Sequence, residues 1–314
     1  MSTSVEWLYE AGIGEARAAL VDGGRIVEGR IELEGNLAVG AIAEARLRDG
    51  HAELADGREV VLDRAPPRLS LGAALLVEIV REAIPEPGRA KRARAIPAPP
   101  EASPCPGPDL LARIVATDFP VRHLRAHEPD ALEAAGWSEL LDEAETGEIG
   151  FGRGALRLSP TPAMTLFDVD GAAPLLDLAL AGATATVQAI RRLDIGGSIG
   201  IDLPTLAGKA ERQRVAEAID AALPLPFERT AMNGFGFLQI VRPRPRASLV
   251  ELLRADPAGA IARAALRAIE RTPPPVPARH TLPAPALAWL DRRPHLVTEL
   301  ARRTGVPIHF VAGS

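Results

Sequence analysis

Three aspartates occur in two apolar segments where a buried strand normally carries no acidic residue. Asp168 and Asp170 lie within residues 166–171, and Asp202 lies within residues 199–203. A carboxylate in such surroundings costs several kcal/mol unless it is paired, hydrogen-bonded or bound to a metal ion. Oxygen ligands that converge from neighbouring strand ends suit Mg²⁺ or Mn²⁺, with water at the remaining octahedral positions. The pattern therefore predicts a divalent-cation site of the kind that hydrolyses phosphodiesters.

A plainer interpretation fits the same spacing. Asp170 precedes a glycine, as in a common turn, and Asp202 precedes a Leu-Pro pair that can end a strand without any chemistry. The spacing alone leaves both interpretations open.

Farther along, the Gly-Phe-Gly segment at 234–236 lacks the strand-to-helix context of a nucleotide-binding loop, so it indicates a turn.

The apolar periodicity predicts the elements that would position these aspartates. Because Asp168 and Asp170 are two positions apart, they leave the same face of their strand. We expect Asp202 to end a neighbouring strand. The expected elements are strands at 155–159 and 163–169, a helix at 174–192, a strand at 198–203, a helix at 207–222 and a strand at 235–242.

The rest of the chain divides by composition. An Asp-Gly-Gly turn at 22–24 predicts a strand hairpin within 5–34. Short alternating segments at 36–96 predict a small closed barrel, and six prolines within 97–108 predict a linker. The remaining expected elements are helices around 109–117 and 128–146, a helix from 257 to 271, and an α/β tail that ends at 307–311.

Length and charge limit the possible classes of protein. The chain has 314 residues, 47% of them hydrophobic, which suits two or three globular domains. The net charge of −5 gives no general attraction to nucleic acid, so RNA contacts must come from local basic patches. A single cysteine, Cys105, excludes an internal disulfide and a structural zinc site. With no signal peptide and no apolar run of ~18–20 residues, we expect a soluble cytoplasmic protein with no membrane partner.

Several segments together resemble the ribonuclease E/G family of bacterial endoribonucleases. The segment at 158–170 resembles the first catalytic strand of that family, and the segment at 191–203 resembles its second catalytic strand with a Gly-Gly lead-in. The agreement in order and spacing spans about 158–254. The helix and strand at 209–215 and 235–242 belong to this part. The opening strand pair at 15–23 is also similar, and a weaker similarity covers the tail from 266 to 311.

The resemblance implies an α+β multidomain fold. The family has an RNase H-like domain that is split by an inserted OB-type RNA-binding barrel, and a DNase I-like catalytic subdomain follows. The implied domains are an RNase H-like domain at 1–35 and 109–157, the barrel at 36–96, a proline-rich linker at 97–108, the DNase I-like subdomain at 158–254 and a small α/β domain at 258–314.

The resemblance also implies roles for individual residues. Asp168 and Asp202 would hold Mg²⁺, or Mn²⁺ in its place, and Asp170 would orient the attacking water. Basic residues are candidates for contacts with RNA phosphates, although a solvated basic segment explains the run at 88–94 and the segment at 242–246 about as well. These candidates are Lys91, Arg92, Arg94, Lys209, Arg212, Arg214 and Arg242.

The chain departs from the family pattern at several points. The cysteine pair that links protomers through zinc is absent, which excludes a zinc-linked dimer. The barrel contains no Phe, Tyr or Trp, so we expect it to bind single strands weakly and mainly through charge. The linker at 97–108 replaces the segment that senses an RNA 5′ monophosphate. Close to the chemistry, the connection after Asp170 is short, and Thr205 stands where the family commonly has another acidic residue.

Three functions remain open from the sequence. The first is a Mg²⁺-dependent endoribonuclease, reduced in activity or narrow in substrate range, that hydrolyses single-stranded RNA by a metal-activated water. The second is a non-catalytic RNA-binding or ribosome-associated scaffold derived from the same fold. The third is a metal-dependent phosphodiesterase for small nucleotides. Only the first two require RNA as a partner.

Overall fold

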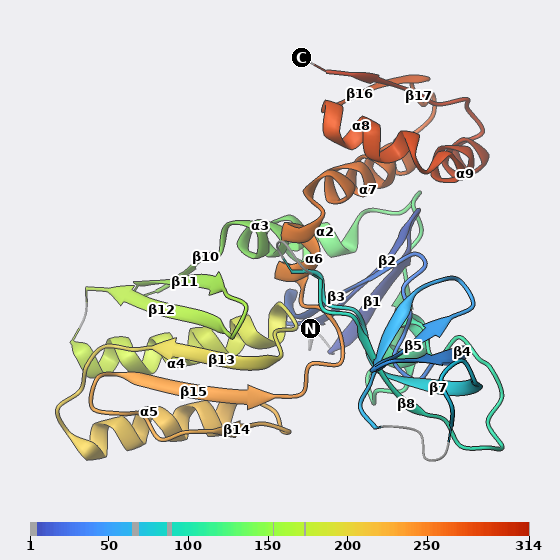
Figure 1. Cartoon of the computed structure of the whole chain (residues 1–314). Helices are drawn as coiled ribbons and strands as arrows, with labels where there is room; N and C mark the ends of the chain where they lie inside the picture. Colours follow the sequence, from blue (N-terminus) through green and yellow to red (C-terminus); the bar gives the residue numbers. More distant parts are fainter. Residues whose placement is uncertain (1–4, 65–68, 87–89, 153, 173, 314) are drawn as a thin grey trace. The chain divides into compact units, whose positions relative to one another are not determined.

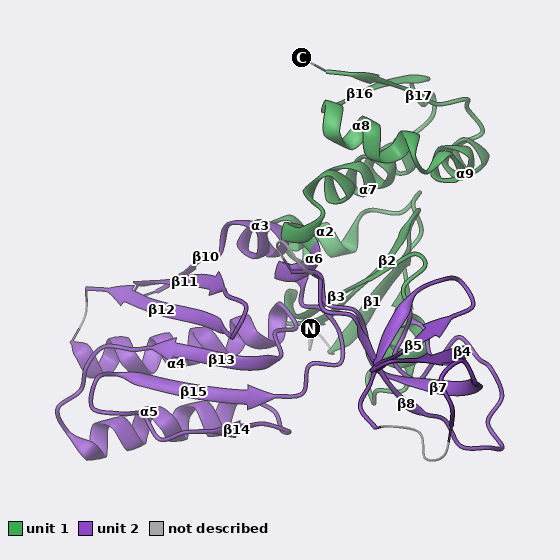
Figure 2. Ribbon diagram, viewed as in Figure 1, with its two compact units in different colours: residues 1–36, 110–138, 253–314 green, residues 37–109, 139–252 purple. Residues whose placement is uncertain are grey.

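The chain folds into two compact units with a mixed α+β architecture (Figure 2). Unit 1 comprises residues 1–36, 110–138 and 253–314, and unit 2 comprises residues 37–109 and 139–252. The computed structural model describes residues 5–64, 69–86, 90–152, 154–172 and 174–313. Within this part of the chain, no helix combines the length and apolarity needed to cross a membrane.

Unit 1 contains a four-stranded sheet of order β3-β2-β1-β9. Gly23 and Gly24 both have positive φ angles, which explains why two glycines form the tight turn of the predicted hairpin. The apolar core beside the sheet contains Trp7 and Leu20 of the strands together with the buried side chains of helix α1. The elements are β1 (Glu6–Ala11), β2 (Glu15–Asp22), β3 (Arg25–Leu33), α1 (Leu110–Val115), β9 (Val121–His123) and α2 (Ala131–Ala134).

A buried ionic cluster joins the three segments of unit 1. Arg17 is 1% exposed and donates to Asp130 Oδ2 at 2.7 Å and to Glu10. Arg271 pairs with the same Glu10. The Arg17 guanidinium also lies 5.3 Å from the ring centroid of Trp137. Because removal of one partner leaves an uncompensated buried charge, this cluster holds the split segments in one arrangement.

The C-terminal part of unit 1 is a small α/β assembly. Asp256 caps α7 by accepting a hydrogen bond from the Gly259 N–H at 3.0 Å. The apolar faces of the three helices, including Leu266, Leu290 and Leu300, pack around the two-stranded parallel sheet. The elements are α7 (Pro257–Glu270), β16 (Arg279–Leu282), α8 (Ala284–Asp291), α9 (Pro294–Thr304) and β17 (His309–Ala312).

Unit 2 begins with a closed five-stranded barrel of order β4-β5-β6-β8-β7. Its core combines several alanines with larger apolar residues such as Val60 and Ile79. The expected barrel is therefore present. The strands are β4 (Ile42–Arg48), β5 (His51–Leu54), β6 (Glu59–Leu62), β7 (Ala74–Arg81) and β8 (Ala93–Pro97).

The proline-rich segment at 97–108 is attached to this barrel. Cys105 and Ile42 exchange two backbone hydrogen bonds of 2.9 Å, so the segment pairs with the start of β4. The Ala98 N–H donates to the Leu76 carbonyl at 2.9 Å. Composition predicted a linker here. In the structure, these hydrogen bonds attach the segment to β4 and β7 of the barrel.

The second part of unit 2 is a six-stranded sheet of order β10-β11-β12-β13-β15-β14, in which only β12 and β13 pair in parallel (Figure 1). Its first strand starts at Glu148, earlier than the predicted domain boundary at residue 158. The elements are α3 (Trp137–Thr146), β10 (Glu148–Phe151), β11 (Gly154–Pro160), β12 (Thr165–Gly171), α4 (Leu175–Arg192), β13 (Gly197–Asp202), α5 (Lys209–Ala222), β14 (Glu228–Arg229), β15 (Phe237–Arg242) and α6 (Leu249–Ala255).

Helix α4 covers one face of this sheet, and α5 runs beside it (Figure 1). The approach is close at Gly182, where a Cβ atom would lie 2.4 Å from Val169 Cγ1. Phe167 and Val169 are buried toward this helix layer. Since side chains alternate along a strand, Asp168 and Asp170 leave the opposite face, which α4 does not cover.

Candidate functional site

The two central strands of the six-stranded sheet bring Asp168 and Asp202 together. β12 and β13 are parallel neighbours, and their register pairs Asp168 with Asp202. Paired residues of neighbouring strands lie about 4.7–4.9 Å apart and project from the same face. Asp170 lies two residues beyond Asp168 on that face, and all three side chains are exposed. The structure thus places the three predicted aspartates at one end of one sheet face.

Neighbouring strands add an arginine and an aromatic ring to this face. On β11, Arg157 lies opposite Asp168, and its Nε donates to Glu148 Oε1 at 3.1 Å. On β15, Phe237 lies opposite Asp202. Sequence reasoning did not find Arg157 or Phe237, because their place beside the aspartates follows from strand register and no local motif marks it.

The carboxylates repel one another. The pKa of Asp168 is raised, first because the group is partly removed from water and then because the negative charges of Asp170 and Asp202 lie close. The positive charge of Arg157 opposes this shift without cancelling it. A bound cation would remove the repulsion, so the electrostatics of this face favour a positively charged ligand.

The donor set fits a hard divalent cation that keeps most of its water. Mg²⁺ commonly takes one or two protein carboxylates and completes its shell with waters and substrate phosphates. Asp168 and Asp202 supply two carboxylates from adjacent strands. Among the described residues, no three or more His, Cys, Asp or Glu side chains already converge on one metal position. A Mg²⁺ ion held by Asp168 and Asp202 would have two protein ligands and water at the remaining positions.

A tightly bonded turn borders the aspartates. The Leu203 N–H, directly after Asp202, donates to the Gly236 carbonyl at 3.2 Å. Thr205 Oγ1 donates to the Phe235 carbonyl at 3.2 Å. Gly236 has a φ of 97°, and a Cβ atom there would lie 2.1 Å from the Leu203 carbonyl oxygen, so only glycine fits. The Gly-Phe-Gly segment is thus a turn, as expected.

The barrel candidates for RNA contact are all ion-paired. Lys91 pairs with Glu86 at 2.5 Å, Arg92 pairs with Glu59 at 2.9 Å, and Arg94 pairs with Asp63 at 2.5 Å. These three basic residues and Arg81 line a hollow of about 590 Å³. The pKa of Arg81 is lowered by burial and by the nearby charges of Arg94 and Arg244. The hollow therefore gathers several basic side chains whose positive charge is largely balanced by acidic neighbours.

The candidates after β13 differ in their surroundings. Arg212 Nη1 donates to the carbonyls of Leu206 and Ala207 at 2.6 and 2.9 Å, so this side chain holds the start of α5. Arg242 Nη1 donates to the Ile195 carbonyl at 3.4 Å. Lys209 and Arg214 are exposed on α5. A role in RNA contact stays a prediction for all four.

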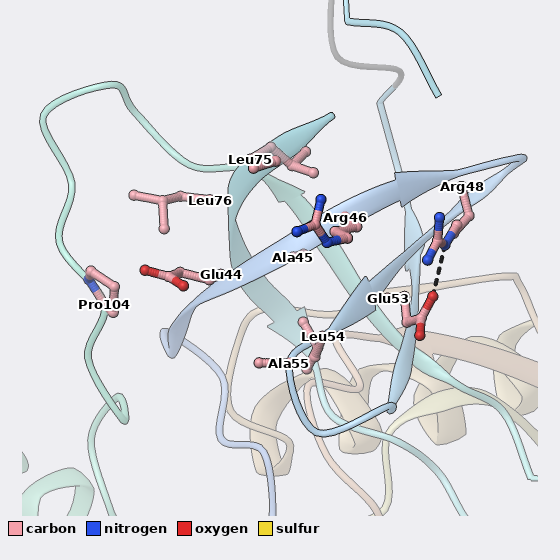
Figure 3. A pocket seen from close by; sticks show the side chains of 11 residues that line it. Glu44, Ala45, Arg46, Arg48, Glu53, Leu54, Ala55, Leu75, Leu76 and Pro104 are labelled. Atoms are coloured by element: carbon pink, nitrogen blue, oxygen red, sulfur yellow. Dashed lines mark hydrogen bonds and ion pairs between the residues drawn. The ribbon is translucent and has the colours of Figure 1, made fainter. Parts of the chain in front are cut away.

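A hollow on the barrel surface lies over β4, β5 and β7 and has a volume of about 750 Å³ (Figure 3). Arg48 in this hollow donates to Glu53 at 2.7 Å. No aromatic side chain lines the hollow, which agrees with the aromatic-free sequence of the barrel. The lining residues are Glu44, Ala45, Arg46, Arg48, Glu53, Leu54, Ala55, Ala74, Leu75, Leu76 and Pro104.

Neither a comparison with protein-family models nor a comparison with curated proteins finds a match to this chain. Inferences about function therefore depend on the geometry described above and on the residues themselves.

Proposed function

We propose that this protein is a metal-dependent endoribonuclease that hydrolyses single-stranded RNA at the aspartate face of the six-stranded sheet. The observation that carries the proposal is the register of β12 and β13, which pairs Asp168 with Asp202 beside a third carboxylate, Asp170. The pKa of Asp168 is raised by partial desolvation and then by the charges of Asp170 and Asp202, and the negative field of these two carboxylates adds support because a divalent cation would neutralise it.

In this proposal, Asp168 and Asp202 hold Mg²⁺, or Mn²⁺ in its place, and Asp170 accepts a hydrogen bond from the attacking water. The bound cation supplies water activation and charge neutralisation at the phosphoryl oxygens. The water oxygen would form a bond to phosphorus and lose a proton to solvent, one bridging P–O bond would break, and the leaving oxygen would take a proton from solvent. The open sheet face leaves room for an extended strand to reach the carboxylates.

The same proposal assigns the domains. We infer an RNase H-like domain from 1–35 and 109–157, an OB-type barrel at 36–96, a DNase I-like subdomain at 158–254 and a small domain at 258–314. The closed barrel, the four-stranded sheet and the six-stranded sheet are compatible with these assignments. The first strand of the six-stranded sheet, β10, starts at Glu148, which lies within the segment 109–157 of the inferred RNase H-like domain.

Cleavage of a labelled single-stranded RNA tests the proposal. We expect cleavage with Mg²⁺, no cleavage with EDTA, and a loss of at least about 100-fold in the Asp168→Asn/Asp202→Asn variant, because both proposed ligands are gone. Asp118→Asn, an exposed aspartate of unit 1, is the matched control and should cleave like the wild type. Cleavage that persists in the double variant would overturn the assignment.

A non-catalytic RNA-binding scaffold is the second candidate. The observations that favour it are the short connection between β12 and α4 and the presence of Thr205, which supplies a hydroxyl and no carboxylate beside the aspartates. This alternative predicts RNA binding that weakens with salt, together with no metal-dependent cleavage under any condition.

A further inference from the structure

The turn that precedes β15 holds an aromatic ring almost fully outside the protein. Phe235 is 85% exposed, more than any other large hydrophobic side chain among the described residues. Single exposed apolar side chains are common on protein surfaces and alone indicate no function. Two further features, the bonding of the turn and its position, distinguish this ring.

The backbone around the ring is fixed by hydrogen bonds. The Asn233 side-chain oxygen accepts from the Phe235 N–H at 2.9 Å and from the Phe237 N–H at 3.0 Å. The Phe235 carbonyl accepts from Thr205 Oγ1 at 3.2 Å. Both backbone polar groups of Phe235 are therefore satisfied. The turn therefore fixes the backbone that carries the ring, while the ring itself stays exposed to solvent.

The turn also lies beside the aspartates. Gly236, the next residue after Phe235, approaches the backbone of Leu203, which directly follows Asp202. The backbone that carries the ring therefore lies next to the end of β13, in the turn that leads into β15, the strand that pairs with β13 at Asp202. A ligand that reaches the carboxylates with a phosphate would bring its adjoining groups to this ring.

We propose that Phe235 is a stacking platform for a nucleobase of single-stranded RNA, next to the phosphate that the aspartates would engage. This inference rests on the proposed RNA-cleaving function. The aspartates repel a phosphate backbone, and stacking attracts RNA without any charge. The barrel offers no Phe, Tyr or Trp for such stacking, because residues 36–96 contain none. Every base has a π-face, so the platform accepts RNA with little sequence preference.

Binding of two labelled oligomers in EDTA tests this role. The probes are a fluorescein-labelled oligoadenylate of about twelve nucleotides and an abasic ribose-phosphate oligomer of equal length and charge. For Phe235→Ala we expect oligoadenylate affinity to fall about 5- to 150-fold, the value of one base–aromatic stack, and abasic affinity to stay unchanged. Phe235→Trp should retain binding, whereas Phe235→Leu, apolar without a π-face, should not.

Leu225→Ala is the matched control, because Leu225 is 79% exposed on the same unit and has no aromatic ring. Equal losses for both oligomers, wild-type affinity in Phe235→Ala or in Phe235→Leu, or no binding by the wild-type protein would overturn the stacking role. Cleavage with Mg²⁺ separates the two proposals. Base-dependent binding without cleavage would support the stacking role of Phe235 and contradict the proposed endoribonuclease activity. Cleavage that is the same in the wild type and in Phe235→Ala would support the activity and contradict the stacking role.

Discussion

The repulsion among three aspartates is the residue-level feature on which the proposed chemistry depends. Asp168 is flanked by Asp170 along β12 and by Asp202 across the strand pair, and its pKa is raised by partial desolvation and by these two charges. A raised pKa means that protons compete with a cation more strongly than at an ordinary aspartate. As the pH falls, Asp168 should take up a proton at a higher pH than an isolated carboxylate does. Metal binding and cleavage should therefore begin to weaken at that higher pH.

Replacement of one neighbour tests this electrostatic account. In Asp170→Asn the second-largest cause of the shift is removed, so we expect the pKa of Asp168 to move down toward its ordinary value. Arg157→Gln removes the opposing positive charge and should move the same pKa up. Carboxyl-carbon NMR titration in EDTA measures both shifts. A pKa of Asp168 that is the same in all three proteins would contradict the repulsion described here.

At the scale of elements, the close packing of α4 on β12 determines where the aspartates point. Gly182 leaves no room for a side chain above Val169, and Val169 lies between Asp168 and Asp170 on the strand. The helix therefore fixes β12 through the face that carries Val169, while the carboxylates project from the opposite face. Overpacking at this contact would move the strand that carries two of the three acids.

Gly182→Ala tests this packing. Alanine favours a helix by about 1 kcal/mol over glycine, yet a Cβ atom 2.4 Å from Val169 Cγ1 forces the layers apart. We expect a net loss of about 1–3 kcal/mol in the free energy of unfolding, measured by urea denaturation. Thr184→Ala, an exposed position of α4, should change little. If Val169→Ala did not reduce the effect of Gly182→Ala in the double variant, the contact would not be its cause.

The apolar runs of the sequence predicted the central elements, and only the folded chain shows their partners. The strands expected at 163–169 and 198–203 correspond to β12 and β13, because buried β-branched runs identify strands locally. The start of the sheet at Glu148, the pairing of Cys105 with Ile42 and the position of Arg157 depend on contacts distant in sequence. No local pattern encodes such contacts, so the sequence could not predict them.

At the scale of the whole molecule, charge provides little general attraction to RNA. The net charge is −5, and the barrel residues Lys91, Arg92 and Arg94 are paired with acidic neighbours. An RNA-cleaving role for this chain therefore requires local attraction at the aspartate face, from a bound cation and from the exposed ring of Phe235. Both requirements are properties of one unit, because Asp168, Asp202 and Phe235 belong to unit 2.

The most direct test of the central claim is a titration of the whole protein with Mn²⁺. Electron paramagnetic resonance measures the concentration of free Mn²⁺ at each step. The wild-type protein should bind Mn²⁺ and release it to excess Mg²⁺, and the Asp168→Asn/Asp202→Asn variant should lose this binding while Asp118→Asn keeps it. Equal binding by the wild-type protein and the double variant, or none by the wild-type protein, would contradict the claim that these paired aspartates hold a divalent cation.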